Sequence, residues 1–203
     1  MNRALAPECG DVPSWVQSGE KCGPGCTLRR VSRLRVQFIH GLEGSPRGAK
    51  ARLLAEHFCA LTPAMDTRDF AACIEVQAAA LRSFRPDVLA GSSFGGAVAV
   101  ELLRAGLWRG PTLLLAQAAL KRDRGARLPE GVSVWLVHGR RDHIVDPEDS
   151  RALAQTGTAS LVRLIEVDDD HPLHATVSGG RLPELVRELA NAGSHRRGKE
   201  EAC

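Results

Sequence analysis

Three residues with the chemistry of a nucleophilic hydrolase each follow a different short apolar run of the chain. Ser93 lies in GSSFG (91–95), which fits the pattern G-x-S-x-G. Asp142 comes shortly after VSVWLVHG (132–139), and His171 comes shortly after ASLVRLIEV (159–167). A serine can attack an acyl carbon when a histidine takes its proton and an acid orients that histidine. These residue types therefore predict nucleophilic catalysis, provided that the fold brings them together.

The surroundings of Ser93 favour a nucleophile over a purely structural turn. The apolar run DVLAG (87–91) predicts a strand, and the alanine-rich FGGAVAVELLRAG (94–106) predicts a helix that Gly106 closes. Glycines suit a strained strand-to-helix turn in which the helix packs closely against the strand. The serine would also lie at the positive end of the helix dipole, which stabilises an oxyanion. Ser92 would take this place only if the turn slipped by one residue.

Apolar runs and helical patterns alternate between residues 33 and 192. Strands are predicted over 34–41, 61–66, 87–91, 111–118, 132–139 and 159–167. Helices are predicted over 45–60, 69–84, 94–106 and 181–190, with a further helix starting at Asp146, and Ser45 and Asp146 are candidate N-caps. This alternation predicts a three-layer α/β/α sandwich with a mostly parallel central sheet. In such sheets, functional residues gather at the carboxyl ends of the strands.

The chain order serine, aspartate, histidine is that of the α/β-hydrolase triad. Two alternatives stay open at this point. Asp146 competes with Asp142, although it also fits an N-cap before Pro147. His174 competes with His171 because it lies three residues further along the same loop.

Two segments carry a resemblance to a known family: FIHGLEGSPRGAKARLL (38–54) and GSSFGG (91–96). Over residues 34–192 the chain resembles α/β-hydrolases, and in particular the short single-domain bacterial esterases of the YqiA type. The resemblance implies that Ser93 is the nucleophile, His171 the general base and Asp142 the orienting acid. It also implies an oxyanion hole made by the backbone N–H groups of Leu42 and Phe94. Lys50 matches the opening segment but has no evident chemical role.

The gap between the fourth and fifth predicted strands indicates which substrate to expect. ALKRDRGARLPEG (119–131) is too short for a helical lid, so we expect an open site that cleaves small or short-chain acyl esters. The basic residues of this gap would suit an anionic substrate, but a solvated loop is the simpler interpretation. A thioesterase or another acyl hydrolase or transferase could use the same triad. A hydrolase-like binding module is the alternative outside enzymes.

Composition excludes several other classes. The chain has 203 residues, 43% of them hydrophobic, and a net charge of +3 that is spread along its length, so neither nucleic acid nor a membrane is an expected partner. We expect a cytoplasmic protein that needs no cofactor and no metal, and oligomeric state is left open. Residues 1–32, which include CGPGC (22–26), are predicted to be a poorly ordered leader, and 193–203 a flexible tail.

Overall fold

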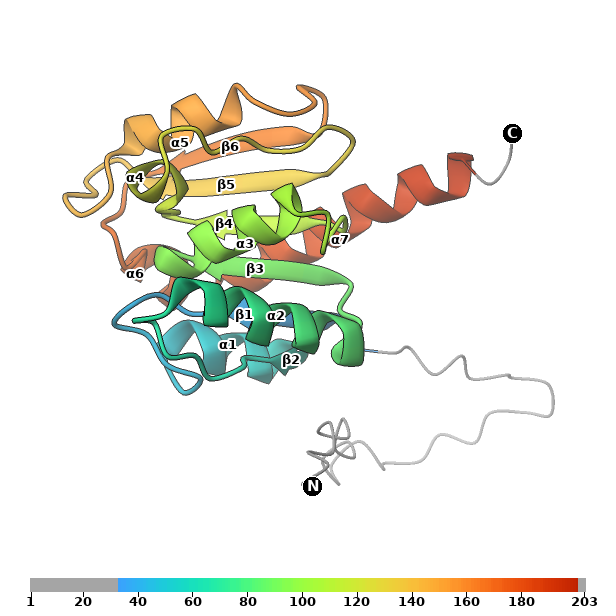
Figure 1. Cartoon of the computed structure of the whole chain (residues 1–203), viewed down its shortest axis with the longest axis horizontal. Helices are drawn as coiled ribbons and strands as arrows, with labels where there is room; N and C mark the ends of the chain where they lie inside the picture. The colour runs from blue at the N-terminus through green and yellow to red at the C-terminus, as the bar shows by residue number, and fades with distance from the viewer. Residues whose placement is uncertain (1–32, 201–203) are drawn as a thin grey trace. The chain divides into compact units, whose positions relative to one another are not determined.

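The described part of the chain is built around a sheet of six parallel strands (Figure 1). The computed structural model describes residues 33–200, with side chains up to residue 193. The strands are β1 (Arg35–Ile39), β2 (Cys59–Leu61), β3 (Val88–Ser92), β4 (Thr112–Leu115), β5 (Val134–Gly139) and β6 (Val162–Val167), in the order β2-β1-β3-β4-β5-β6. Each neighbouring pair is parallel. Every residue of β3, β4 and β5 is buried, as expected for central strands that are covered on both faces.

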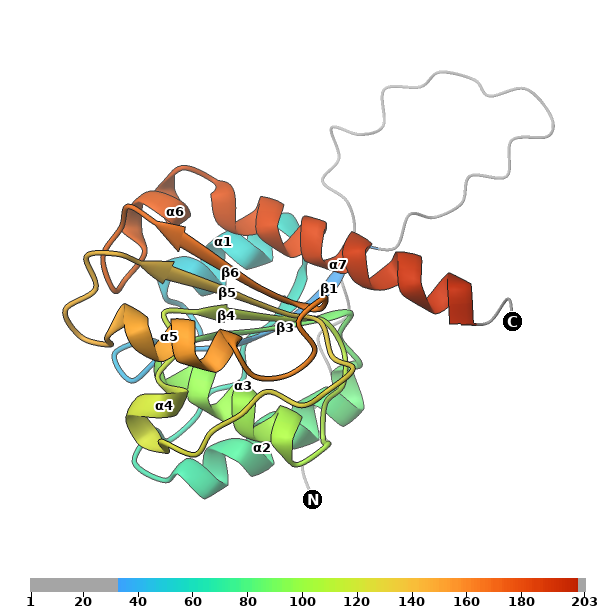
Figure 2. The same ribbon diagram turned by 90° about the horizontal axis from the view of Figure 1, so that it is seen from above.

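Helices cover both faces of the sheet, which confirms the predicted three-layer sandwich (Figure 2). One layer contains α1 (Ala49–His57), α6 (His174–Ser178) and α7 (Arg181–Glu200), and the other contains α2 (Phe70–Phe84), α3 (Phe94–Arg104), α4 (Ala119–Arg122) and α5 (Pro147–Ala154). Each layer forms its own apolar core with the sheet, around Leu54 and Leu185 on one face and around Leu102 and Leu153 on the other. Burying one such leucine contributes roughly 1.5–3 kcal/mol.

The strand order reverses between β1 and β3, because the chain runs outward from β1 to β2 and then returns to β3. Ligands of parallel sheets bind outside the carboxyl ends of the strands at such a point. Ile39 pairs with Gly91 in the register, so the loops after β1 and β3 begin side by side. A Cβ atom placed on Gly41 would lie 3.3 Å from Ser93 Cβ. The reversal therefore places Ser93 against the loop that follows β1.

Several predicted boundaries were wrong: the fourth and sixth strands are shorter than predicted, and the first helix ends at His57, so Cys59 and Ala60 belong to β2. The second strand spans Cys59–Leu61 instead of 61–66, because Pro63 has no N–H group for the ladder and the segment around it cannot pair. The first helix starts at Ala49 with Gly48 as its N-cap, so Ser45 is not the N-cap. The Ser45 hydroxyl instead accepts a hydrogen bond from the Arg47 N–H within a turn that precedes the helix.

The described chain contains two helices that were not predicted and one that is longer than predicted. The short helices α4 and α6 were not predicted, and the helix predicted over 181–190 is α7, which continues to Glu200. Within residues 33–200, no helix is long and apolar enough to cross a membrane. Residues 1–32 and 201–203 lie outside the described residues, and with them the predicted leader, its CGPGC segment and the end of the predicted tail.

Candidate active site

Ser93 occupies a sharp turn between β3 and α3. Its backbone has φ 53° and ψ −117°, a combination that non-glycine residues rarely adopt and that costs about 1–3 kcal/mol. The turn requires glycine on both sides. A Cβ atom on Gly91 would collide with the carbonyl of Gly95, and one on Gly95 would collide with the carbonyls of Ile39 and His40. The glycines thus let α3 approach the strand ends, and the strained turn presents the serine at the edge of the sheet.

His171 connects Ser93 to Asp142. His171 Nε2 lies 2.9 Å from Ser93 Oγ, and His171 Nδ1 lies 2.7 Å from Asp142 Oδ2. A carboxylate only accepts hydrogen bonds, so Nδ1 carries the proton and Nε2 is free to accept the serine hydroxyl. The Asp142 side chain is fully buried, whereas Ser93 and His171 are partly exposed. This geometry meets the requirement for a serine that a histidine activates as general base.

The Asp142 carboxylate is held in its charged form by the turn that follows β5. Its Oδ1 atom accepts hydrogen bonds from the N–H groups of Ile144 (2.8 Å) and Val145 (2.9 Å). Burial alone would raise the pKa of Asp142, but the hydrogen bonds from Val145, His171 and Ile144 outweigh it and keep the pKa below its ordinary value. Asp142 is therefore charged at neutral pH and can stabilise an imidazolium at His171.

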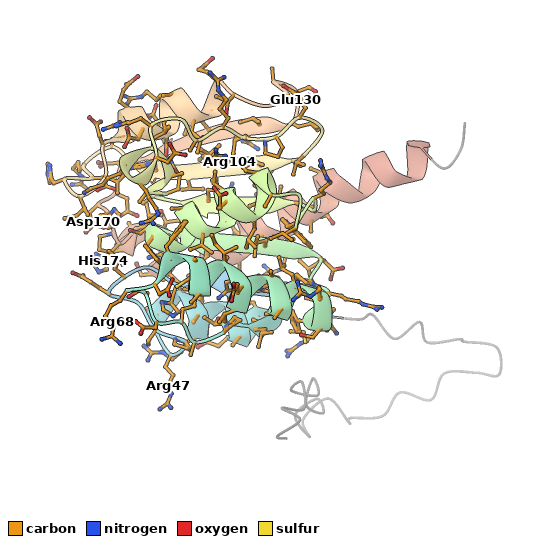
Figure 3. The ribbon with its side chains drawn as sticks, viewed as in Figure 1. Arg47, Arg68, Arg104, Glu130, Asp170 and His174 are labelled. Carbon is orange, nitrogen blue, oxygen red and sulfur yellow. The ribbon has the colours of Figure 1, made fainter. Side chains whose placement is uncertain are left out.

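The three alternatives from the sequence occupy other places. Asp146 caps α5, because its side chain accepts a hydrogen bond from the Glu148 N–H (2.9 Å). His174 is exposed and pairs with Asp170 (2.9 Å), and Figure 3 shows both side chains at the end of the molecule where the strands terminate. Ser92 is buried as the last residue of β3. None of the three belongs to the hydrogen-bonded chain through His171.

The loop that carries His171 is fixed by the buried carboxylate of Asp169, the middle residue of an acidic run. Asp169 is buried and accepts hydrogen bonds from the N–H groups of Asp170 (3.0 Å), Ala175 (3.3 Å) and Thr176 (2.8 Å) and from the Thr176 hydroxyl (2.8 Å). Burial raises the pKa of Asp169, but these hydrogen bonds, led by those from Thr176, bring the pKa below its ordinary value. Asp169 therefore holds the loop together as a charged group.

Lys50 reaches the same loop from α1, on a segment far away in the sequence. Its Nζ atom donates a hydrogen bond to the carbonyl of Pro172 (2.6 Å), the residue next to His171. Burial lowers the pKa of Lys50, while the nearby charges of Asp170 and Asp169 oppose that shift. The contact gives Lys50 a structural role that its position in the sequence did not reveal.

Two backbone N–H groups border Ser93 and are available to a ligand. Phe94 is the first residue of α3, where an N–H has no partner inside the helix. Leu42 follows Gly41, whose backbone lies against Ser93. Within residues 33–193, neither N–H donates a hydrogen bond to another protein atom. In the same part of the chain, no group of three or more His, Cys, Asp or Glu side chains is placed to hold a metal ion.

This sheet, with a serine at the strand-to-helix turn and an acid and a histidine at the following strand ends, is the α/β-hydrolase fold, and solved structures share it. A protein from Xanthomonas campestris pv. campestris, assigned to the hydrolases of the alpha/beta superfamily, is 26% identical with a TM-score of 0.64, over 78% of this chain and 99% of that one. Alpha/beta hydrolase domain-containing protein 10 from mouse is 16% identical, with a TM-score of 0.65, over 78% and 90%. Est1E from Butyrivibrio proteoclasticus is 17% identical, with a TM-score of 0.58, over 79% and 89%.

The chain therefore belongs to the α/β-hydrolase superfamily. No protein-family model matches it, and neither does the sequence of any curated protein. The narrower likeness to YqiA-type esterases stays a prediction.

Proposed function

We propose that the protein is a serine hydrolase that cleaves small or short-chain acyl esters. Ser93 is the nucleophile, His171 the general base and Asp142 the acid that orients the histidine. One observation carries the proposal: the unbroken chain of hydrogen bonds from Asp142 Oδ2 through both ring nitrogens of His171 to Ser93 Oγ. This chain begins at a fully buried carboxylate and ends at a partly exposed hydroxyl on a strained turn.

The reaction proceeds through an acyl-enzyme. Ser93 Oγ attacks the ester carbonyl carbon while its proton moves to His171 Nε2, and the resulting oxyanion accepts hydrogen bonds from the N–H groups of Leu42 and Phe94. When the tetrahedral intermediate collapses, the ester C–O bond breaks and His171 gives the proton to the departing alcohol. A water molecule, deprotonated by His171, then attacks the acyl-enzyme and releases the acid. Protein groups and water supply every step, so no cofactor is required.

The open surroundings of Ser93 support a small substrate. The connection between β4 and β5 contains a single short helix, α4, and no inserted lid. Two large apolar side chains lie exposed next to site residues: Leu42 is 60% exposed and Ile144 is 59% exposed. Isolated exposed apolar side chains are common, but Leu42 itself carries a proposed oxyanion N–H, and Ile144 donates its N–H to the acid Asp142. They offer apolar contact to a short acyl or alcohol group without enclosing a long chain.

The basic residues between β4 and β5 give weak support to an anionic substrate. Lys121 donates a hydrogen bond to the Ile144 carbonyl (2.6 Å), and the Arg122 guanidinium lies 3.6 Å from the centre of the Phe70 ring. Arg124 pairs with a carboxylate of α5. These three basic side chains thus already contact other parts of the protein. A neutral ester is therefore the preferred substrate, although the same acyl-enzyme chemistry also accommodates thioesters.

A panel of substrates tests the proposal. Turnover of p-nitrophenyl esters from acetate to palmitate should be fastest for the short acyl chains and absent from Ser93→Ala. Thioesters and amides with the same acyl group, measured in parallel, define which bond the enzyme prefers. A preference for long acyl chains would refute the short-chain assignment. A folded wild-type protein that turns over none of these compounds would refute the enzyme and favour a binding module.

A further inference from the structure

A second imidazole touches the carboxylate of Asp142, from the strand that precedes it. His138 belongs to β5 and is 0% exposed. Its Nε2 atom lies 3.0 Å from Asp142 Oδ2 and 3.1 Å from the Val145 carbonyl oxygen, and its Nδ1 atom lies 2.7 Å from Ser150 Oγ. Both nitrogen atoms of this buried ring are thereby engaged, and Nε2 makes its contacts with the turn that contains the acid.

The partners of His138 fix the orientation of its ring. Nε2 faces two oxygen atoms that only accept hydrogen bonds, so it carries a proton, which is directed to the Val145 carbonyl. Nδ1 is hydrogen-bonded to Ser150 Oγ, which also accepts a hydrogen bond from Gln117 Nε2 (3.1 Å). Ser150 and Gln117 thus hold the other side of the buried ring.

This buried chain returns to the nucleophile turn. Gln117 Oε1 accepts the N–H of Ala119 (2.7 Å), and the N–H of the intervening Ala118 donates to the Ser93 carbonyl (3.1 Å). A Cβ atom on Gly96, in the first turn of α3, would meet Gln117 Cβ at 2.7 Å. The same segment thus contacts the serine turn at one end and, through Ser150, the histidine beside the acid at the other.

We propose that His138 is a positioning residue for the proton relay, which fixes Asp142 relative to His171. The inference depends on the function proposed above. His138 acts through two contacts. By holding the Val145 carbonyl, it fixes the turn whose N–H groups bind Asp142 Oδ1. Its polar Nε2–H, which lies beside Asp142 Oδ2, also offsets part of the negative charge with which Oδ2 interacts with His171.

The charged groups around this pair are otherwise occupied. Glu166 faces His138 in the register of β5 and β6 and is paired with Arg151. Asp149, next to Ser150 on α5, is paired with Arg124 (2.6 Å). On the His171 loop, Asp169 and Asp170 receive the hydrogen bonds described above, and Lys50 binds the Pro172 carbonyl. His143 is exposed. Loss of the His138 ring therefore acts on the charge of Asp142 and, through it, on the basicity of His171.

Three variants separate positioning from simple packing. His138→Leu keeps a similar volume but removes the polar contacts of the ring. His138→Gln restores an N–H donor, and Ser150→Ala leaves the ring but removes the hydroxyl that binds its Nδ1 atom. Thr112→Val is the matched control: Thr112 is equally buried and hydrogen-bonded to Trp108 Nε1 (3.0 Å), but it lies at the amino end of β4, away from the site. This control substitution should lower the melting temperature without changing catalysis.

The readouts are kcat, KM and the pH dependence of kcat/KM for p-nitrophenyl acetate. For His138→Leu we expect kcat to fall about 10- to 100-fold, by analogy with the loss seen when an outer partner of a metal-binding residue is removed, with KM nearly unchanged. The acid limb of kcat/KM should move to higher pH, because an Asp142 without its Nε2–H neighbour stabilises protonated His171 more strongly. His138→Gln should recover part of both changes. Ser150→Ala should lower kcat and move the acid limb in the same directions as His138→Leu. The fall in kcat should be about 3- to 10-fold, which corresponds to the loss of one hydrogen bond.

The outcomes distinguish this inference from the function on which it depends. A wild-type protein without ester turnover would overturn both. An active wild type with a folded His138→Leu variant whose kcat and acid limb are unchanged would overturn the positioning role alone. If His138→Leu does not fold, Ser150→Ala decides, and wild-type kinetics in that variant would refute the role. Equal shifts in the Thr112→Val control would also refute it, because they would show a general effect of weakened packing.

Discussion

The loops after β6 and after β1 both border Ser93, but they are built differently. The loop after β6, which carries His171, is held by the buried carboxylate of Asp169 and by Lys50 from a distant helix. In the loop after β1, residues 42–47 are all exposed, and the chain forms local turns such as the one closed by Gly44 N–H and the Gly41 carbonyl (3.1 Å). The loop proposed to take part in proton transfer is thus fixed by tertiary contacts, whereas the loop proposed to contact the substrate depends on backbone turns. Changes to the first should reduce kcat, and changes to the second should alter KM.

The largest effect is expected at His171. His171→Ala removes the proposed base and should lower kcat for a short ester about a million-fold, the loss that follows removal of the serine or the histidine from a hydrolase triad. His174→Ala is the control from the same loop, because the His174 side chain is exposed and pairs with Asp170, away from Ser93 and Asp142. It should retain kcat within about threefold, since exposed ion pairs contribute little. Similar losses in both variants would mean that the loop as a whole, and not one imidazole, supports catalysis.

A smaller effect is expected when the β6 loop loses its internal support. Asp169→Asn replaces one acceptor oxygen by an NH₂ group that cannot accept from the facing N–H groups, and it should cost about 2–3 kcal/mol of unfolding free energy at pH 7. The pKa of Asp169 is lower in the folded protein than in the unfolded chain, so its contribution is complete above the ordinary aspartate pKa and disappears as the pH falls toward the folded value. Urea unfolding between pH 7 and pH 3 should therefore show that the unfolding free energies of the wild type and of Asp169→Asn converge at low pH. A difference that is independent of pH would contradict a charged Asp169.

The hydrogen bond from α1 should have a more modest effect. Lys50→Met keeps the aliphatic part of the side chain but removes the hydrogen bond to the Pro172 carbonyl, and we expect kcat to fall about 3- to 10-fold with KM unchanged. Arg52→Met, on the same helix, is the control, because Arg52 is exposed and its side chain bonds the carbonyl of Arg47, away from the His171 loop. Steady-state kinetics of the two variants measure the difference. Wild-type kcat in Lys50→Met would show that the His171 loop keeps its position without this hydrogen bond.

The smallest effect is expected on the β1 side. Leu42→Ala removes an exposed apolar side chain but keeps the backbone N–H, so kcat should stay unchanged. KM for a butyrate ester should rise about fourfold for each methylene group of the substrate that Leu42 no longer covers. Leu107→Ala, an exposed leucine after α3, should change neither constant. A fall in kcat for Leu42→Ala would show that the side chain also maintains the oxyanion N–H, which would weaken the contrast between the two loops.

The fold and the convergence of Ser93, Asp142 and His171 could be predicted because their signals are local. Apolar runs mark the strands, and apolar residues at helical spacing mark the helices. Ser93, Asp142 and His171 each follow a strand end, so a parallel sheet is enough to bring them near one another. The choice between Asp142 and Asp146 required coordinates. Both residues lie in the same loop, and only the course of the turn shows that one binds His171 and the other caps a helix.

The roles of Lys50, His138 and Asp169 could not be predicted from the sequence. Their partners are distant in the chain, or the surrounding residues indicate a different role. Lys50 and Pro172 are 122 residues apart, and His138 resembles the end of an ordinary buried strand. Asp169 lies in an acidic run, DDD (168–170), whose composition indicates solvent exposure, although its middle residue is buried. The position of β2 differs in this respect, because the sequence contains its cause. Pro63 has no N–H group for the ladder, which favours a strand that ends before it, as Cys59–Leu61 does.

The most direct test of the account is to locate the adduct that an alkyl fluorophosphonate forms with the folded protein. Peptide mass mapping should find the phosphonyl group on the oxygen of residue 93 in the wild type, with the rate of modification strongly reduced in His171→Ala and in Asp142→Asn. An adduct on Ser92, or a folded wild type that the reagent leaves unmodified, would contradict it.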